Sequence, residues 1–136
     1  MKVNELAQAA GVSAHTVRFY VRAGLLRPGR DASNGYARFA WADVARLQFI
    51  RRAKRLGFTL TEIQTIFQMA ERAESPCPMV RQIVSARLVQ IREQIDDITA
   101  AEARIRCALK TWRSLPDATP TGTQVCRLIE MLSYER

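Results

Sequence analysis

The stretch ELAQAAGVSAHTVRFYVRAGLL, residues 5–26, decides the fold of the N-terminal part of this chain. Its alanine-rich first half predicts a short helix that ends at Gly11, because glycine readily adopts the positive φ found after helix C-termini. Ser13 is a suitable N-cap for a second helix, which runs to Gly24. Two short helices joined by a tight, glycine-containing turn are typical of a helix-turn-helix.

The second helix carries side chains suited to reading DNA. Val17 and Val21 lie four residues apart, so they can pack inward together. The other faces of this helix carry hydrogen-bond donors for phosphates or bases, namely His15, Thr16, Arg18, Tyr20 and Arg22. In a helix-turn-helix the second helix enters the major groove, so we expect these residues to contact DNA.

The next segments predict a wing and a second helical pair. Asn-Gly at residues 34–35 is a strong hairpin signal, so we expect a basic β-wing over residues 27–40. This wing carries Arg30, Tyr36 and Arg38 as DNA contacts. Apolar residues then keep helical spacing up to Gly57, and TLTE at residues 59–62 has the form of a capping box. The prolines of SPCP, residues 75–78, break the chain, which predicts a DNA-binding domain over residues 1–75.

A long apolar stripe predicts a dimerisation helix over residues 76–113. Apolar residues recur at alternating intervals of four and three residues, which is the heptad pattern of a coiled-coil seam. One glutamate occupies a seam position at which polar residues often fix the register of the two helices. A helix of about 50 Å cannot bury such a stripe within so small a domain. We expect an antiparallel coiled coil with a second copy; an intramolecular hairpin is the alternative. The seam consists of Val84, Leu88, Ile91, Ile95, Ile98, Glu102, Ile105, Leu109 and Trp112.

Composition and charge narrow the functional class. Ten lysines and arginines but only two aspartates lie between Arg18 and Arg55, so this segment accounts for the whole net charge of +8. A localised basic field suits a polyanion such as DNA, although a merely solvated basic surface is the alternative. No phosphate loop, nucleophile elbow or paired acid and base points to an enzyme. We expect a cytoplasmic protein, because the sequence shows neither a signal peptide nor an apolar membrane span. The three cysteines are scattered, which predicts reduced thiols.

Together these motifs resemble the MerR family of transcription regulators, over residues 3–70 and, less closely, through the long helix and terminal loop. The matching segments are Glu5-Leu6-Ala7, Gly11-Val12, Thr16-Val17-Arg18-Phe19-Tyr20, Gly24-Leu25-Leu26, Asn34-Gly35-Tyr36, Leu47-Gln48-Phe49-Ile50-Arg51 and Leu56-Gly57-Phe58.

The resemblance implies a mainly α fold: a winged helix-turn-helix domain, a long antiparallel dimerisation helix, and a short loop and helix over residues 114–136. It further implies a homodimer that binds a pseudo-palindromic operator and distorts a long promoter spacer, so that RNA polymerase can engage it. The resemblance assigns Arg51 to a helix that touches the DNA backbone. The family usually has arginine directly after the wing tyrosine, where this chain has Ala37, and Arg38 could substitute.

The resemblance also makes Cys77 and Cys126 candidate metal ligands. Sensors of divalent Zn, Cd, Pb or Hg carry cysteine at the position of Cys77, whereas Cu(I) sensors carry serine, and thiolates suit such metals. A site that takes Cys77 from one chain and Cys126 from the other would link dimer geometry to metal occupancy.

The chain departs from the metal-sensor pattern at the end of the long helix. Residues 110–113 contain no cysteine where a further ligand is expected, and Cys107 falls at position f, away from the seam. Asp117 or Glu130 could complete the site. Three interpretations therefore stay open: metal sensing, redox or electrophile sensing through the thiols, and incidental cysteines in a non-sensing DNA-binding dimer.

Overall fold

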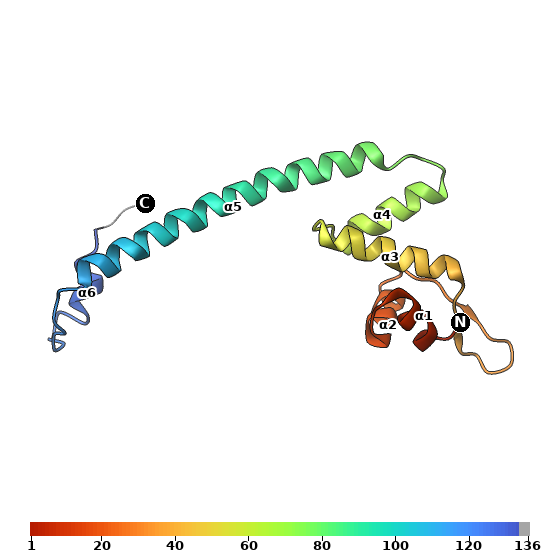
Figure 1. The fold of residues 1–136 in the computed structure, drawn as a ribbon, viewed down its shortest axis with the longest axis horizontal. Coiled ribbons are helices and arrows are strands. Elements are labelled where there is room, and N and C mark those ends of the chain that lie inside the picture. The colour runs from red at the N-terminus through yellow and green to blue at the C-terminus, as the bar shows by residue number, and fades with distance from the viewer. Residues whose placement is uncertain (134–136) are drawn as a thin grey trace. The chain divides into compact units, whose positions relative to one another are not determined.

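A computed structural model describes residues 1–133, which form two compact units, Met1–Arg87 and a second unit that begins at Leu88. The fold is mainly helical (Figure 1), as predicted. The elements are α1 (Val3–Ala10), α2 (Ala14–Arg22), β1 (Gly29–Arg30), β2 (Ala37–Arg38), α3 (Trp41–Arg55), α4 (Leu60–Glu71), α5 (Cys77–Trp112) and α6 (Arg127–Glu130). No helix in this described part is long and apolar enough to cross a membrane.

The predicted helix-turn-helix is present as α1 and α2. Helix α1 ends at Gly11, whose φ of 73° is in the left-handed region that favours glycine. The Ser13 hydroxyl oxygen accepts a hydrogen bond from the backbone N–H of Thr16 at 3.1 Å, which caps the start of α2. Both helix boundaries therefore follow from local chemistry that the sequence displays.

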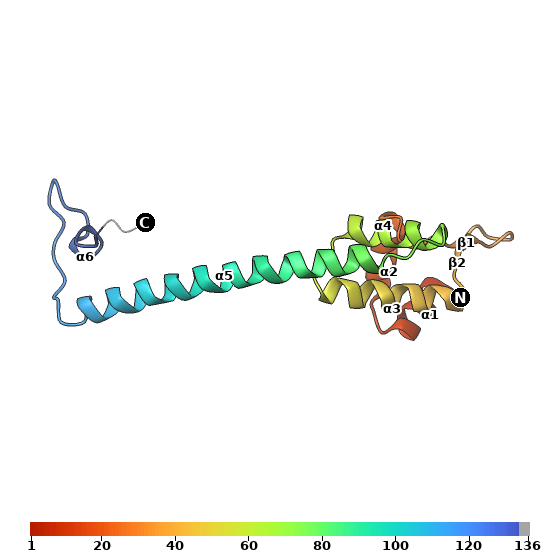
Figure 2. The same ribbon diagram turned by 90° about the horizontal axis from the view of Figure 1, so that it is seen from above.

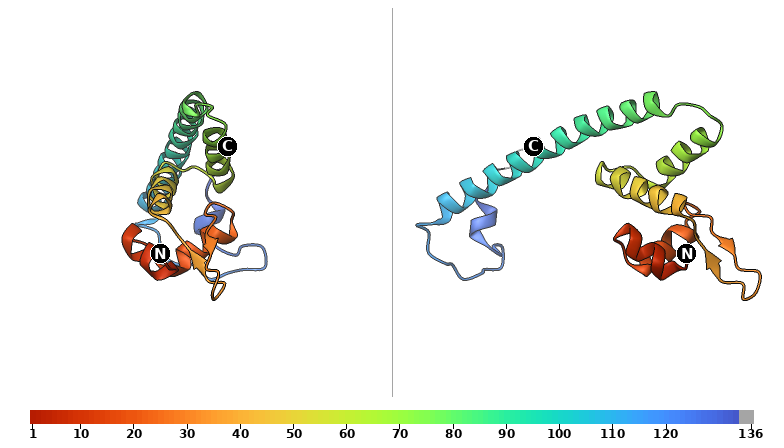
Figure 3. Two further views of the ribbon diagram at one scale, coloured as in Figure 1. Left: turned by 90° about the vertical axis from the view of Figure 1, so that its right-hand side faces the viewer. Right: turned by 45° about the vertical axis from the view of Figure 1, so that its right-hand side comes forward.

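The predicted wing is an antiparallel hairpin of β1 and β2, in which Gly29 pairs with Arg38 and Arg30 pairs with Ala37. Figure 3 shows this hairpin extending from the helical part of the first unit. The Asn34 side-chain oxygen accepts a hydrogen bond from the N–H of Tyr36 at 3.0 Å. Gly35 follows with a φ of 71°, so the Asn-Gly pair shapes the turn as expected.

The core of the first unit joins α1–α4 and the first turns of α5. Its fully buried side chains are Leu6, Val17, Leu25, Leu26, Leu47, Ile50 and Ile63. Met79, Val80, Ile83 and Val84 of α5 pack against this cluster. The predicted capping box is also present, since Thr59 and Glu62 bond reciprocally at the start of α4.

Helix α5 runs without interruption for 36 residues (Figure 2). The apolar seam side chains from Leu88 to Leu109 are all exposed in the single chain. An exposed heptad stripe of this length is what a coiled-coil partner covers. In the second unit α6 lies beside the last turns of α5, where Met131 and Leu132 share a cavity wall with Trp112.

Candidate DNA-binding face and cysteine sites

Helix α2 exposes most of the side chains predicted to read DNA. His15, Arg18 and Arg22 are exposed, and the half-buried Thr16 shares a 2.9 Å hydrogen bond with the Ser13 hydroxyl. The prediction that Tyr20 lies on a free face was wrong, because Tyr20 is only 9% exposed and belongs to the core. It stands three residues after Val17, which puts both side chains on the buried face of α2.

The two arginines of the wing are each held by a contact within the wing, Arg38 by the carboxylate of Asp31 and Arg30 by a backbone carbonyl. Asp31 accepts hydrogen bonds from the Ser33 N–H at 2.9 Å and from the Ser33 hydroxyl at 2.5 Å, and it forms a 3.4 Å ion pair with Arg38. The Ser33 hydroxyl is the main reason why the pKa of Asp31 is lowered; the Ser33 N–H and Arg38 lower it further. Arg30 donates to the Gly35 carbonyl at 3.3 Å. Tyr36 is exposed and free to approach DNA.

Arginines from the recognition helix and the wing meet at one shallow hollow. Arg18 and Arg22 of α2 and Arg30 of β1 line this hollow of about 300 Å³, whose floor includes Phe39. The fold thus brings together three of the predicted DNA contacts that are separate in the sequence. Three arginines at the edge of one concave surface bring three positive charges close together, which suits phosphates.

Other arginines of the basic segment support the fold. Arg51, predicted to touch the DNA backbone, donates to the carbonyl of Ala10 at 2.9 Å while remaining exposed. Arg46, which was not singled out from the sequence, donates to the Leu25 carbonyl at 2.8 Å and lies 3.8 Å above the Phe67 ring. Carbonyl groups at or just beyond the C-terminal end of a helix lack a partner within that helix. Arg46 and Arg51 each bond such a carbonyl, which a count of charges in the sequence cannot reveal.

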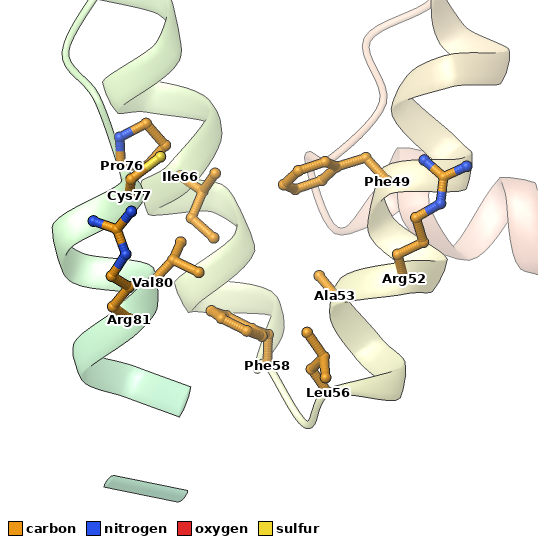
Figure 4. Close-up of a pocket in the computed structure, with 10 residues that line it drawn as sticks. All are labelled: Phe49, Arg52, Ala53, Leu56, Phe58, Ile66, Pro76, Cys77, Val80 and Arg81. Atoms are coloured by element: carbon orange, nitrogen blue, oxygen red, sulfur yellow. The ribbon is translucent and has the colours of Figure 1, made fainter. Parts of the chain in front are cut away.

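Cys77 is the first residue of α5 and is an exposed, free thiol. It borders an apolar cavity of about 400 Å³ between α3, α4 and α5, which Figure 4 shows. Phe49, Leu56, Phe58 and Val80 contribute its apolar wall, with Arg52 and Arg81 beside them. Val80 and Val84, one helical turn apart on α5, both pack against the core of the first unit.

Cys126 lies at the N-cap position of α6 and is half-buried and free. The Glu130 carboxylate accepts hydrogen bonds from the N–H groups of Val125 at 2.6 Å and Cys126 at 3.0 Å. Arg127 donates to the Pro116 carbonyl at 2.7 Å, which closes the loop before α6. One oxygen of Glu130, Oε1, therefore holds the backbone at the start of α6.

Cys107 is exposed and lines a separate cavity of about 330 Å³ together with Trp112, Met131 and Leu132. The cavity also contains Trp112 of the predicted seam, so the place of Cys107 outside the seam stays a prediction. Within residues 1–133 of a single chain, no three His, Cys, Asp or Glu side chains are grouped so that they could hold a metal ion.

Comparisons with known proteins agree with the winged fold and its basic face. A family model described as a MerR HTH family regulatory protein matches residues 1–70, and one described as MerR, DNA binding matches residues 44–107. The mercuric resistance operon regulatory protein of Bacillus cereus is 33% identical over 133 residues, covering 96% of each chain.

Solved structures extend this similarity over the whole chain. The transcription regulator PbrR691 of Ralstonia metallidurans CH34, in complex with lead(II), has a TM-score of 0.75 and 26% identity, covering 97% of this chain and 99% of that one. The dual-function regulator MerR of Bacillus megaterium MB1, in complex with mercury(II), has a TM-score of 0.58 and 29% identity, covering 96% of this chain and 97% of that one.

Proposed function

This chain belongs to the MerR family of DNA-binding transcription regulators, and from that membership we propose that its homodimer controls a promoter in response to a soft or divalent metal ion. Cys77 of one chain and Cys126 of the other hold the ion. The observation that carries this proposal is the free, exposed Cys77 thiol at the start of α5, beside an apolar cavity between α3, α4 and α5.

Each chain of the dimer contributes one basic reading head, which is the DNA-binding part formed by α1, α2 and the β1–β2 wing. The two reading heads bind a pseudo-palindromic operator in the cytoplasm. The exposed donors of α2 approach the bases, and the wing and Arg51 approach the backbone. The proposed DNA contacts are His15, Thr16, Arg18, Arg22, Arg30, Tyr36, Arg38 and Arg51. The heads are held apart by α5, so the dimer acts on promoter DNA by bending and untwisting its spacer for RNA polymerase.

The donor set fits the proposed metal. Two thiolates suit Hg(II), Pb(II), Cd(II) or Zn(II), and relatives of this chain are named for mercury resistance or were solved with lead(II). In an antiparallel coiled coil the start of one α5 lies beside the end of the other. A metal ion bridging the two thiolates would tie the start of α5 in one chain to the α6 segment of its partner.

The experiment that tests this proposal uses complementation between chains. Homodimers of Cys77→Ser and of Cys126→Ser each lose metal binding, whereas a heterodimer of the two variants contains one intact site. We expect native mass spectrometry with Hg(II) and Pb(II) to find metal on the heterodimer but on neither homodimer, with Cys107→Ser binding like the natural chain.

The outcomes separate the interpretations of the cysteines. A heterodimer without metal contradicts the shared site. If the natural dimer also binds neither ion, and the oxidant diamide alters operator-dependent transcription only when Cys77 is present, the cysteines are redox sensors instead. A dimer that binds operator DNA but responds to neither treatment is a non-sensing regulator.

A further inference from the structure

Helix α4 contacts both the dimerisation helix and the recognition helix through polar side chains within its first two turns. Glu62 faces α5, and Gln64, two residues later, faces the end of α2. All of these groups belong to the first compact unit, Met1–Arg87. The two contacts give α4 a place between the element that pairs with a second copy and the element that reads DNA.

The contact with α5 is an ion pair. Arg87 of α5 donates through Nη2 to Oε1 of Glu62 at 2.9 Å, and both side chains are only 25% exposed. The same Glu62 oxygen accepts the N–H of Thr59 at 2.8 Å, which caps α4. The guanidinium also lies 5.9 Å from the centre of the Phe58 ring. A shift of α5 therefore acts on the capped end of α4.

The contact with α2 is a hydrogen bond to a helix end. Gln64 Nε2 donates to the carbonyl of Ala23, the C-cap residue of α2, at 2.5 Å. Farther along α4, the Phe67 ring lies under Arg46, whose Nε holds the Leu25 carbonyl just beyond α2. These carbonyls have no partner within α2 itself. Gln64 of α4, together with Arg46 of α3 that stacks on the Phe67 ring of α4, therefore sets the position of the C-terminal end of α2.

We propose that α4 transmits displacements of α5 to the recognition helix, with Arg87, Glu62 and Gln64 as the positioning residues. Glu62 and Gln64 lie two residues apart on one continuously hydrogen-bonded helix, so they move together. A displacement of Glu62 therefore also displaces Gln64. The role in DNA regulation rests on the proposed function, whereas the mechanical coupling itself needs neither metal nor DNA to be measured. Coupling of this kind is demonstrated by perturbing one end and reading the other.

The test perturbs α5 and measures hydrogen exchange at the end of α2. In the full-length dimer, Arg87→Leu should speed exchange of the amides of residues 24–26 about fivefold, the factor for one lost hydrogen bond. Arg87→Lys, which keeps a charged donor, should restore most of the protection. Arg92→Leu is the matched control, because Arg92 is exposed on the same helix, lies outside the first unit, and has no side-chain hydrogen bond or ion pair among residues 1–133.

A second substitution tests the route. In a Gln64→Leu background, Arg87→Leu should add little further exchange at residues 24–26, since the connection is already broken. Amides of α1 around Leu6 serve as the internal reference and should not change. Equal acceleration at α1, equal acceleration by Arg92→Leu, or full additivity with Gln64→Leu would each overturn the proposal.

Binding to an inverted-repeat duplex, selected from random DNA by the natural chain, is measured in parallel. Arg87→Leu should weaken that binding several-fold, and Arg87→Lys should weaken it less. If the natural chain selects no duplex, the proposed function fails while the exchange result still decides the coupling. If binding is unaffected by Arg87→Leu although exchange increases, α4 does not position the recognition helix for DNA.

Discussion

Replacing Ile95 by alanine should weaken the dimer by about one to two orders of magnitude. Ile95 is a seam residue of α5 and is 55% exposed in the single chain. Full burial of such a side chain contributes about 1.5–3 kcal/mol, so burying the half that is still open contributes about 0.8–1.6 kcal/mol. The substitution removes two isoleucines from each dimer, or about 1.6–3.3 kcal/mol, and each 1.4 kcal/mol is about tenfold in the dissociation constant.

The assay is sedimentation equilibrium of Ile95→Ala beside a matched control, Val89→Ala. Val89 lies on the same helix and is also 55% exposed, but it occupies position b of the heptad. Alanine is a strong helix former, so neither substitution should unfold α5. We expect Val89→Ala to leave the dissociation constant within about threefold of the natural value. Equal weakening by both substitutions, or by neither, would refute the seam as the dimer interface.

Two further predictions concern the reading head and the α4 cap. Arg18→Ala should lower affinity for the selected inverted-repeat duplex by about 1–3 kcal/mol and make it less salt-dependent in gel-shift titrations. Arg72 is an exposed arginine outside the basic segment, and Arg72→Ala should change neither the affinity for DNA nor its salt dependence. In the folded protein the pKa of Glu62 is held below 4.5, mainly by the hydrogen bond from the Thr59 N–H and also by Arg87. The ionised Glu62 therefore stabilises the fold above pH 4.5. This stabilisation is lost as the pH falls through the pKa that Glu62 has in the folded protein. Urea unfolding should therefore show a smaller loss of stability below pH 4.5 for Glu62→Gln than for the natural chain or the control Glu71→Gln.

The fold was predictable wherever its determinants are local. Gly11, Ser13 and the Asn-Gly pair act within a few residues of themselves, so the turn, the helix cap and the wing can be read from the sequence. The heptad period likewise predicted α5, because apolar residues at that spacing lie along one face of a helix. The domain division into 1–75, 76–113 and 114–136 stays a prediction.

The sites were less predictable because they depend on tertiary contacts. Tyr20 was assigned to the DNA face from its side-chain chemistry, but helical geometry places it beside Val17 in the core. Gln64 was not singled out, since an unremarkable glutamine shows its use only when the Ala23 carbonyl is found opposite it. Glu130 stays a predicted ligand, and the sequence does not reveal that its Oε1 accepts two backbone N–H groups at the start of α6.

The basic segment shows why net charge and DNA-binding charge differ. The count of ten cations treats every side chain alike, but the half-buried Arg46 bonds the main-chain carbonyl of Leu25 just beyond the end of α2. Loss of such an arginine disturbs the reading head itself, whereas loss of Arg18 removes a charge from its surface. Both losses weaken DNA binding, and only the second must also reduce the number of counterions released. The salt dependence of affinity, measured residue by residue, therefore separates the cations that position the head from those that hold the DNA.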